Sequence, residues 1–198
     1  MDQITQMLFW ISNSLLIPNI LMLLILFVRS LMLLGSFYNS FMLKRKTALL
    51  LKDRAEQSIE SVQEVLPQFG GKNASLFGTY LTELMKRESP DEDYVNYLLN
   101  KFENQAEKEL NLPRMLTKVG PVLGLIGTLI SMSPALVGLS GGDITGMAYN
   151  MQIVFATTVV GLVISLIGLV ITQYKQRWFA SDLNNLEFIA SLLLKARK

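Results

Sequence analysis

The sequence contains no cysteine and no histidine, and only 17% of its 198 residues are charged. The lack of cysteine excludes disulfides, a thiolate nucleophile and a cysteine-based zinc site. The lack of histidine removes the commonest general base and the commonest metal ligand. An ordinary soluble domain carries about 25% charged residues. The shortage of charge therefore points away from an ordinary soluble domain.

Charge is missing above all from three long stretches. Arg29 is the only charged residue in residues 8–43, and residues 119–142 and 144–174 have none. Each stretch exceeds the ~20 residues that a helix needs to cross a bilayer. We therefore predict an all-α integral membrane protein with three transmembrane helices. This pattern excludes a small soluble enzyme and a nucleic-acid-binding domain, and we expect no enzymatic activity, no cofactor and no metal site.

The first apolar stretch is expected to stay in the membrane rather than to be removed. Asp2 precedes it and no lysine or arginine does, so the basic start of a secretory signal is missing. Arg29 lies inside this stretch, where a charge costs ~2.5–3.5 kcal/mol even on lenient scales. Two interpretations stay open: the guanidinium reaches up to the membrane surface, or it meets an acidic partner.

Basic residues next to the spans predict the orientation. They follow the first span at residues 44–46, precede the second span at Arg114 and Lys118, and follow the third span at Lys175 and Arg177. The N-terminal tail and residues 134–150 contain none. Because cytoplasmic flanks collect lysine and arginine, we expect the N-terminus outside, the C-terminus inside, and a multi-pass protein of the inner (cytoplasmic) membrane.

Apolar spacing and turn residues divide the chain further. Helical periodicity predicts a helical cytoplasmic segment that includes a helix over residues 75–86, and Leu112-Pro113 is expected to end its last helix. The second and third transmembrane helices are expected to extend into the cytoplasm. The expected divisions are the outer N-terminus with the first span (1–43), the cytoplasmic segment (44–113), the second span (114–140), a short outer loop (141–147), the third span (148–177) and an amphipathic cytoplasmic helix (178–198).

Small and hydroxyl residues form a stripe on each of the last two spans. The glycines are Gly120, Gly124 and Gly127 on the second span, and Gly161 and Gly168 on the third. Such stripes allow helix backbones to approach closely, so we assign these glycines to helix packing. The hydroxyl residues are candidates to line an ion path: Thr128 and Thr158 first, with Thr157, Ser131 and Ser165 beside them. A threonine in a helix can also bond to its own backbone and serve no further role.

Two segments of these spans resemble a known family. The sequence GPVLGLIGT at residues 120–128 resembles the second-span motif of the MotA/TolQ/ExbB proton-channel family, and ATTVVGL at residues 156–162 resembles its third-span motif. The order, the separation and the three-span layout agree as well. The resemblance is strong over residues 115–180. The modest size of the cytoplasmic segment makes it more similar to the transport-type (ExbB/TolQ-like) branch than to flagellar stators.

The resemblance implies a homopentameric ring around a dimer of single-span ExbD/TolR/MotB-like partners. The partner supplies a membrane aspartate, and ion flow drives mechanical work elsewhere. Thr128 and Thr158 take the places of the family's two threonines. Some members carry a glutamate five residues before the second threonine, where this chain has Ile153. The transported ion is expected to be H⁺, with Na⁺ as the other option.

The residues fit this implication independently, because no span contains Asp, Glu or His and a proton carrier must come from another chain. The expected function is a subunit of an ion-driven inner-membrane motor or energy-transducing channel. The alternative is a non-conducting membrane scaffold that uses the same small-residue faces only for packing.

Overall fold

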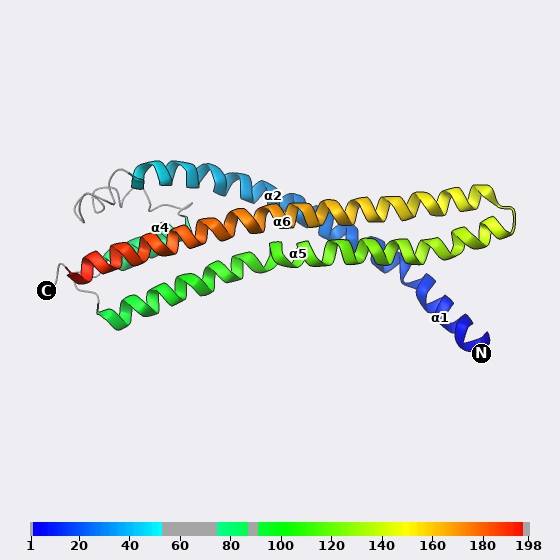
Figure 1. Cartoon of the computed structure of the whole chain (residues 1–198), viewed down its shortest axis with the longest axis horizontal. Helices are drawn as coiled ribbons and strands as arrows, with labels where there is room; N and C mark the ends of the chain where they lie inside the picture. Colours follow the sequence, from blue (N-terminus) through cyan, green and yellow to red (C-terminus); the bar gives the residue numbers. More distant parts are fainter. Residues whose placement is uncertain (1, 53–74, 87–90, 196–198) are drawn as a thin grey trace. The chain divides into compact units, whose positions relative to one another are not determined.

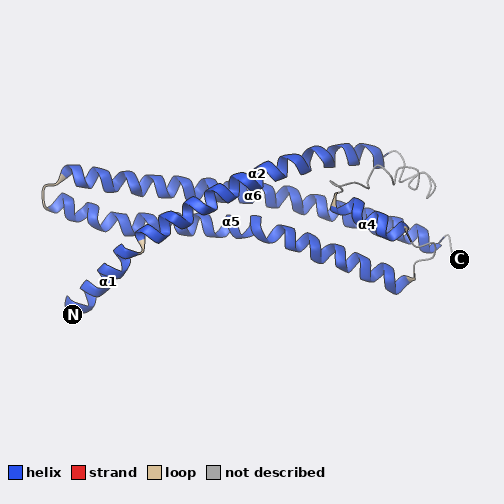
Figure 2. Cartoon of the chain, turned by 180° about the vertical axis from the view of Figure 1, so that it is seen from behind, coloured by secondary structure: helices blue, strands red, loops and turns tan. Residues whose placement is uncertain are grey.

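The structure, a computed structural model, describes residues 2–52, 75–86 and 91–195 (Figure 1). Every element within these residues is a helix (Figure 2): α1 (Asp2–Ser14), α2 (Leu16–Lys52), α4 (Leu76–Met85), α5 (Glu92–Ser140) and α6 (Ile144–Lys195). Three stretches, Gln6–Met42, Glu92–Ser140 and Ile144–Lys195, are long and apolar enough to cross a membrane. The prediction of an all-helical chain with three candidate spans is confirmed. Residues 53–74 and 87–90 of the predicted cytoplasmic segment lie outside the described residues.

The second predicted span is part of one long helix. α5 continues through Pro113, Pro121 and Pro134, so the helix end predicted at Leu112-Pro113 is wrong. A proline inside a helix removes one backbone hydrogen bond and crowds the preceding turn. Pro121 leaves the Thr117 carbonyl, four residues earlier, without its helical donor, and Ser165 Oγ of α6 donates to that carbonyl at 2.9 Å. α6 also packs closely beside Pro113, where a Cβ on Gly168 would lie 2.7 Å from the Pro113 carbonyl oxygen.

The connection between α5 and α6 is only Gly141–Asp143, shorter than the predicted loop 141–147. Gly142 has a φ of 78°, a left-handed conformation that glycine adopts without strain. Asp143 Oδ1 accepts a hydrogen bond of 2.9 Å from the backbone N–H of Gly146. This cap allows α6 to begin at the next residue, Ile144. It also engages the Asp143 carboxylate, the one closest to the third span in the sequence.

Contacts between residues divide the chain into two compact units. Unit 1 comprises Met1–Leu34 and Leu112–Thr172, and unit 2 comprises Gly35–Asn111 and Gln173–Lys198. The core of unit 1 joins α2, α5 and α6, and its buried members are Leu23, Leu26, Leu116, Leu123 and Ile164. Large apolar side chains such as Leu125, Leu129 and Leu166 are exposed on the surface of unit 1, as expected for lipid-facing or subunit-facing helices.

Unit 2 has a separate core between α4, the first part of α5 and the last part of α6. Its buried members are Phe77, Tyr80, Leu81, Leu84, Val95, Leu98, Phe102, Leu186, Ile189 and Ala190. Ser75 caps α4, since its Oγ accepts from the backbone N–H of Gly78 at 3.1 Å. The helix predicted over residues 75–86 is therefore confirmed. The amphipathic face predicted for residues 178–198 supplies one side of this core.

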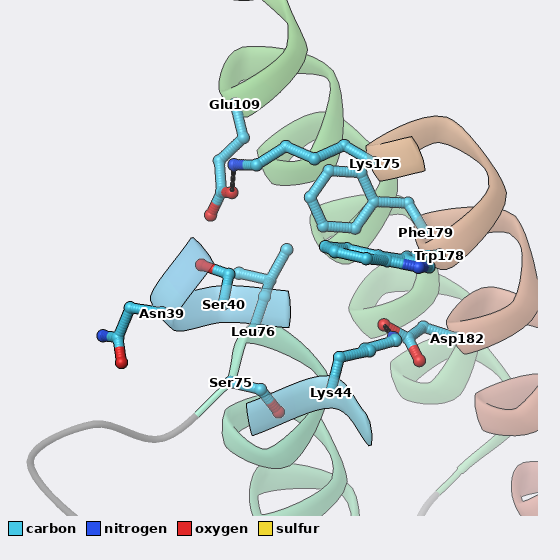
Figure 3. Close-up of a pocket in the computed structure, with 10 residues that line it drawn as sticks. All are labelled: Asn39, Ser40, Lys44, Ser75, Leu76, Glu109, Lys175, Trp178, Phe179 and Asp182. Carbon is cyan, nitrogen blue, oxygen red and sulfur yellow. Dashed lines mark hydrogen bonds and ion pairs between the residues drawn. The ribbon is translucent and has the colours of Figure 1, made fainter. Parts of the chain in front are cut away.

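Unit 2 also holds a polar pocket of about 250 Å³ with aromatic walls (Figure 3). Two ion pairs border it. Lys175 Nζ lies 2.8 Å from Glu109 Oε2, and Lys44 Nζ pairs with Asp182 Oδ2. Trp178, one of the walls, stacks on Phe37 with ring centroids 5.3 Å apart.

Asp182 is the most deeply buried carboxylate of these pairs, with 10% of its side chain exposed. Burial raises its pKa above the ordinary value of 3.8, and Lys44 acts in the opposite direction. The native carboxyl thus holds its proton more tightly than the unfolded one. Stability contributed by the protonated form is lost as the pH rises from 3.8 toward the native pKa. At neutral pH Asp182 depends on Lys44 for compensation.

We expect Asp182→Asn to destabilise the protein by about 2 kcal/mol, because it leaves the Lys44 ammonium without its partner. Replacing both partners by apolar residues, Lys44→Met with Asp182→Leu, should recover most of the loss. The apparent melting temperature of the purified protein measures both effects. Glu83→Gln is the control, since its pair with Lys101 is 40–45% exposed and should contribute little. A double variant as unstable as Asp182→Asn would contradict this account.

Candidate ion path and helix-packing site

The backbones of α5 and α6 touch at two glycines. A Cβ atom added to Gly120 would lie 2.6 Å from the Gly161 carbonyl oxygen, and one added to Gly161 would lie 2.5 Å from the Gly120 carbonyl oxygen. Gly124 is also close, since its Cβ would lie 3.2 Å from the Thr157 carbonyl oxygen. Only glycine permits this approach, because any side chain at Gly120 or Gly161 would overlap the opposite backbone.

The contact continues toward the other end of unit 1. A Cβ atom on Gly168 would lie 2.7 Å from the Pro113 carbonyl oxygen. Ser165 Oγ donates a 2.9 Å hydrogen bond to the backbone carbonyl of Thr117. Ser165, a candidate for the ion path, thus joins the two helices directly. All five glycines assigned to packing lie against atoms of another helix.

The three threonine candidates differ in burial. Thr157 is only 6% exposed, whereas Thr128 and Thr158 are half-buried. Each hydroxyl donates to a carbonyl of its own helix: Thr128 to Leu125 at 2.7 Å, Thr158 to Val154 at 2.9 Å, and Thr157 to Ile153 at 3.0 Å.

This pattern decides what the hydroxyls can offer to a ligand. A hydroxyl has one proton to donate and two lone pairs to accept. Since the protons of Thr128 and Thr158 are engaged, their oxygens are free to accept. The half-buried pair can therefore receive a hydrogen bond from water or from a protonated carboxyl, with no charge of its own.

A residue of the first span, Asn19, was not among the predicted site residues and lies in this region. Its side chain is buried, and Nδ2 donates to the Leu123 carbonyl oxygen at 3.2 Å. The position of a Cβ atom on Gly127 lies 3.0 Å from Asn19 Nδ2 and 2.7 Å from Thr157 Oγ1. The sequence contains an indication that Asn19 is buried, because it shares a helix face with the apolar residues Leu23 and Leu26.

The remaining candidates differ in burial and surroundings. Ser131 is fully buried, and its Oγ has no hydrogen-bond partner among the described residues. Arg29 is exposed on the surface of α2. Thr157 borders an apolar groove of about 360 Å³ between α2 and α6. No group of acidic side chains that could hold a metal ion occurs among the described residues.

The comparison with known families decides the identity. The model of the MotA/TolQ/ExbB proton channel family matches residues 72–187, which is more than half of the chain. The chain belongs to this family. The comparison with individual curated proteins found no significant match.

The family match covers the second and third spans with all the glycine, threonine and serine candidates, and it stops short of the first span. With the three apolar helices, it identifies a multi-pass membrane protein of an ion-channel family. Asn19 and Arg29 lie outside the matched residues.

We expect Gly161→Ala to separate α5 from α6, because its Cβ would overlap the Gly120 carbonyl. Overpacking of this kind costs about 1–3 kcal/mol, which a lower apparent melting temperature should show. The matched control is Gly35→Ala, since a Cβ at Gly35 meets nothing within 4 Å. Equal stability of the two variants would contradict the close contact.

Proposed function

We propose that this chain is the channel subunit of an ion-driven inner-membrane motor, and that Thr128 and Thr158 line its ion path. Half-buried hydroxyls within the charge-free stretches 119–142 and 144–174 carry this proposal. Family membership supports the general role. H⁺ is the proposed ion, and Na⁺ fits the same hydroxyl face. The proposal includes no enzymatic reaction and no cofactor.

A second protein has to supply the proton carrier. Residues 119–142 and 144–174 contain no Asp, Glu or His, and Asp143 is engaged in capping α6. We propose a single-span ExbD/TolR-like partner that brings an aspartate to the level of the threonines. The hydroxyl oxygens would accept a hydrogen bond from its protonated form. Ion transfer then depends on the change of that aspartate between its charged and its neutral state.

The proposed assembly is a homopentamer around a dimer of this partner. The exposed leucines of α5 and α6, such as Leu125 and Leu162, offer apolar surface for neighbouring copies and lipid. The basic residues that flank each span support a cytoplasmic C-terminus and an outer N-terminus. In this proposal, the partner and the proteins that it contacts determine which process the motor drives.

A non-conducting scaffold is the second candidate. The observation that favours it is that every candidate threonine hydroxyl already bonds to its own helix. Backbone contact at Gly120 and Gly161 would serve a scaffold equally well. The two functions differ in what happens when the hydroxyls are removed and the shape is kept.

We expect Thr128→Val with Thr158→Val to reduce proton flux about tenfold, since each of the two lost hydrogen bonds to the protonated carboxyl contributes ~0.5–1.5 kcal/mol. Valine keeps the shape of threonine and removes the hydroxyl. The measurement is proton uptake by vesicles that hold the chain with its partner, with a protonophore to define full dissipation. The native mass of the complex should still show five copies.

Thr79→Val is the matched control, because Thr79 is exposed on α4 and its hydroxyl also donates to a backbone carbonyl. Its flux should equal that of the unchanged protein. Unchanged flux in the double variant would leave packing as the role of both stripes and would favour the scaffold.

The orientation can be tested by labelling, because the chain has no cysteine of its own. A Ser140→Cys variant should react with an impermeant thiol reagent added to intact cells, since Ser140 is exposed at the end of α5. A Thr79→Cys variant should react only after permeabilisation. The reverse pattern would overturn the proposed orientation.

A further inference from the structure

Two polar side-chain atoms are buried in unit 1 without a hydrogen-bond partner among the described residues, Asn19 Oδ1 and Ser131 Oγ. Asn19 is 6% exposed and Ser131 is 0% exposed. Buried polar atoms of folded proteins are nearly always paired, with protein or with ordered water. The penalty is greater in a membrane span, where no bulk solvent can compensate. Both atoms therefore call for a partner.

The helix directions bring the two residues to one layer. Gly124 packs against Thr157 and Gly138 against Met147, so α5 and α6 run antiparallel. In this register Ser131, midway between these glycines, lies level with the turn of α6 that precedes Thr157. Within unit 1, α2 runs parallel to α6 (Figure 1).

Side chains of a helix lean toward its N-terminus. On α2 and α6 this carries Asn19 and Thr157 toward the level of Ser131, and on α5 it carries Ser131 back toward them. Thr157 Oγ1 follows this direction, since it lies within hydrogen-bond distance of the Ile153 and Val154 carbonyl oxygens. Asn19 and Thr157 both lie close to Gly127, and Ser131, one turn further on the same face of α5, leans toward them.

The chemistry of the three groups selects the ligand. Asn19 Oδ1 can only accept, and Thr157 Oγ1 has its proton engaged and can only accept. Ser131 Oγ can do both. A ligand that pairs with all three groups must therefore donate at least two hydrogen bonds. Water does this, and a typical buried water makes about three hydrogen bonds to such groups.

The groove beside Thr157 does not offer the same chemistry. Apart from Thr157, its lining is apolar and includes Leu23, Phe27 and Val160. An apolar space of this kind stays dry. Water is expected only at the layer where the polar atoms meet.

We propose that the three spans of each protomer enclose a water-binding site formed by Asn19 Oδ1, Ser131 Oγ and Thr157 Oγ1. The site hydrates the interior of the protomer at the level of Thr157, one residue from the half-buried Thr158. This role in the ion path rests on the proposed function, whereas the existence of the site does not. The site also gives the first span a specific place in the packing.

Ser131→Ala tests the site most directly, because the Ser131 hydroxyl has no hydrogen-bond partner among the described residues to lose. With a bound water, the apparent melting temperature of the full chain in lipid nanodiscs should fall by about 2–4 °C, the shift that one lost hydrogen bond gives at this size. An equal or higher melting temperature would mean that the site is dry and would overturn the proposal. Ser140→Ala, at an exposed serine, is the control.

A double-mutant cycle tests whether Asn19 and Ser131 share one water. Asn19→Leu also removes the bond to Leu123, so its loss should exceed that of Ser131→Ala. In the double variant with Ser131→Ala the combined loss should be smaller than the sum, because the water is already lost in either single variant. Additive losses would contradict a shared water. If Asn19→Leu fails to fold, Asn19→Ser takes its place in the cycle.

Sodium distinguishes water from a bound cation, since Na⁺ would also bind to these oxygens. The melting temperature should be the same in sodium chloride and in choline chloride. A rise in sodium alone, absent in Ser131→Ala, would replace the water by a cation and overturn the proposal. These readouts do not use ion flux, so a chain that conducts nothing can still have the site, and a conducting chain can lack it.

Discussion

The rest of unit 1 depends on the backbone contact between α5 and α6 at Gly120 and Gly161. A Cβ at either position would lie within 2.6 Å of the opposite carbonyl oxygen. Dispersion contacts and weak Cα–H···O bonds hold such a pair in lipid, where burial of apolar surface gives little driving force. The contact fixes the register of the two spans. That register places Gly127 against Thr157. It leaves Thr158 and Thr128 half-buried beside the contact between α5 and α6.

The same constraint explains how a proline-rich helix survives. α5 contains Pro113, Pro121 and Pro134, each of which removes a backbone donor. Beside Pro113, the glycine of α6 at Gly168 approaches so closely that a Cβ there would lie 2.7 Å from the Pro113 carbonyl oxygen. At Pro121 the neighbouring helix also fills the missing hydrogen bond, because Ser165 Oγ donates at 2.9 Å to the Thr117 carbonyl that this proline leaves without a donor. Local helix propensity predicted a helix end at Pro113. Propensity does not describe packing between helices, and α5 continues through this proline.

The glycine stripes, the three spans and the capped helix at Ser75 follow from the sequence because each depends on local periodicity or on a single cap. Asn19 could not be placed in the same way. Its partner, the Leu123 carbonyl, lies 104 positions away along the chain, and nothing local selects it. The two adjacent threonines also differ in burial, which the sequence alone does not predict. Thr157 is buried between the helices and Thr158 is half-buried. Residue spacing predicts which residues share a helix face. Which part of that face is buried depends on where α2 packs against α5 and α6.

Unit 1 therefore combines an apolar exterior with a few polar atoms whose hydrogen-bonding capacity is incompletely used. Charge inside the spans would cost several kcal/mol per group, and the sequence avoids it everywhere in residues 119–142 and 144–174. Hydroxyl oxygens with engaged protons can accept a hydrogen bond at much lower cost. A partner carboxyl that meets such oxygens would be stabilised when protonated, whereas these oxygens have no proton to donate to its charged form. An aspartate brought by another chain would then be held loosely in one state and released in the other, which is the property that a moving ion carrier requires.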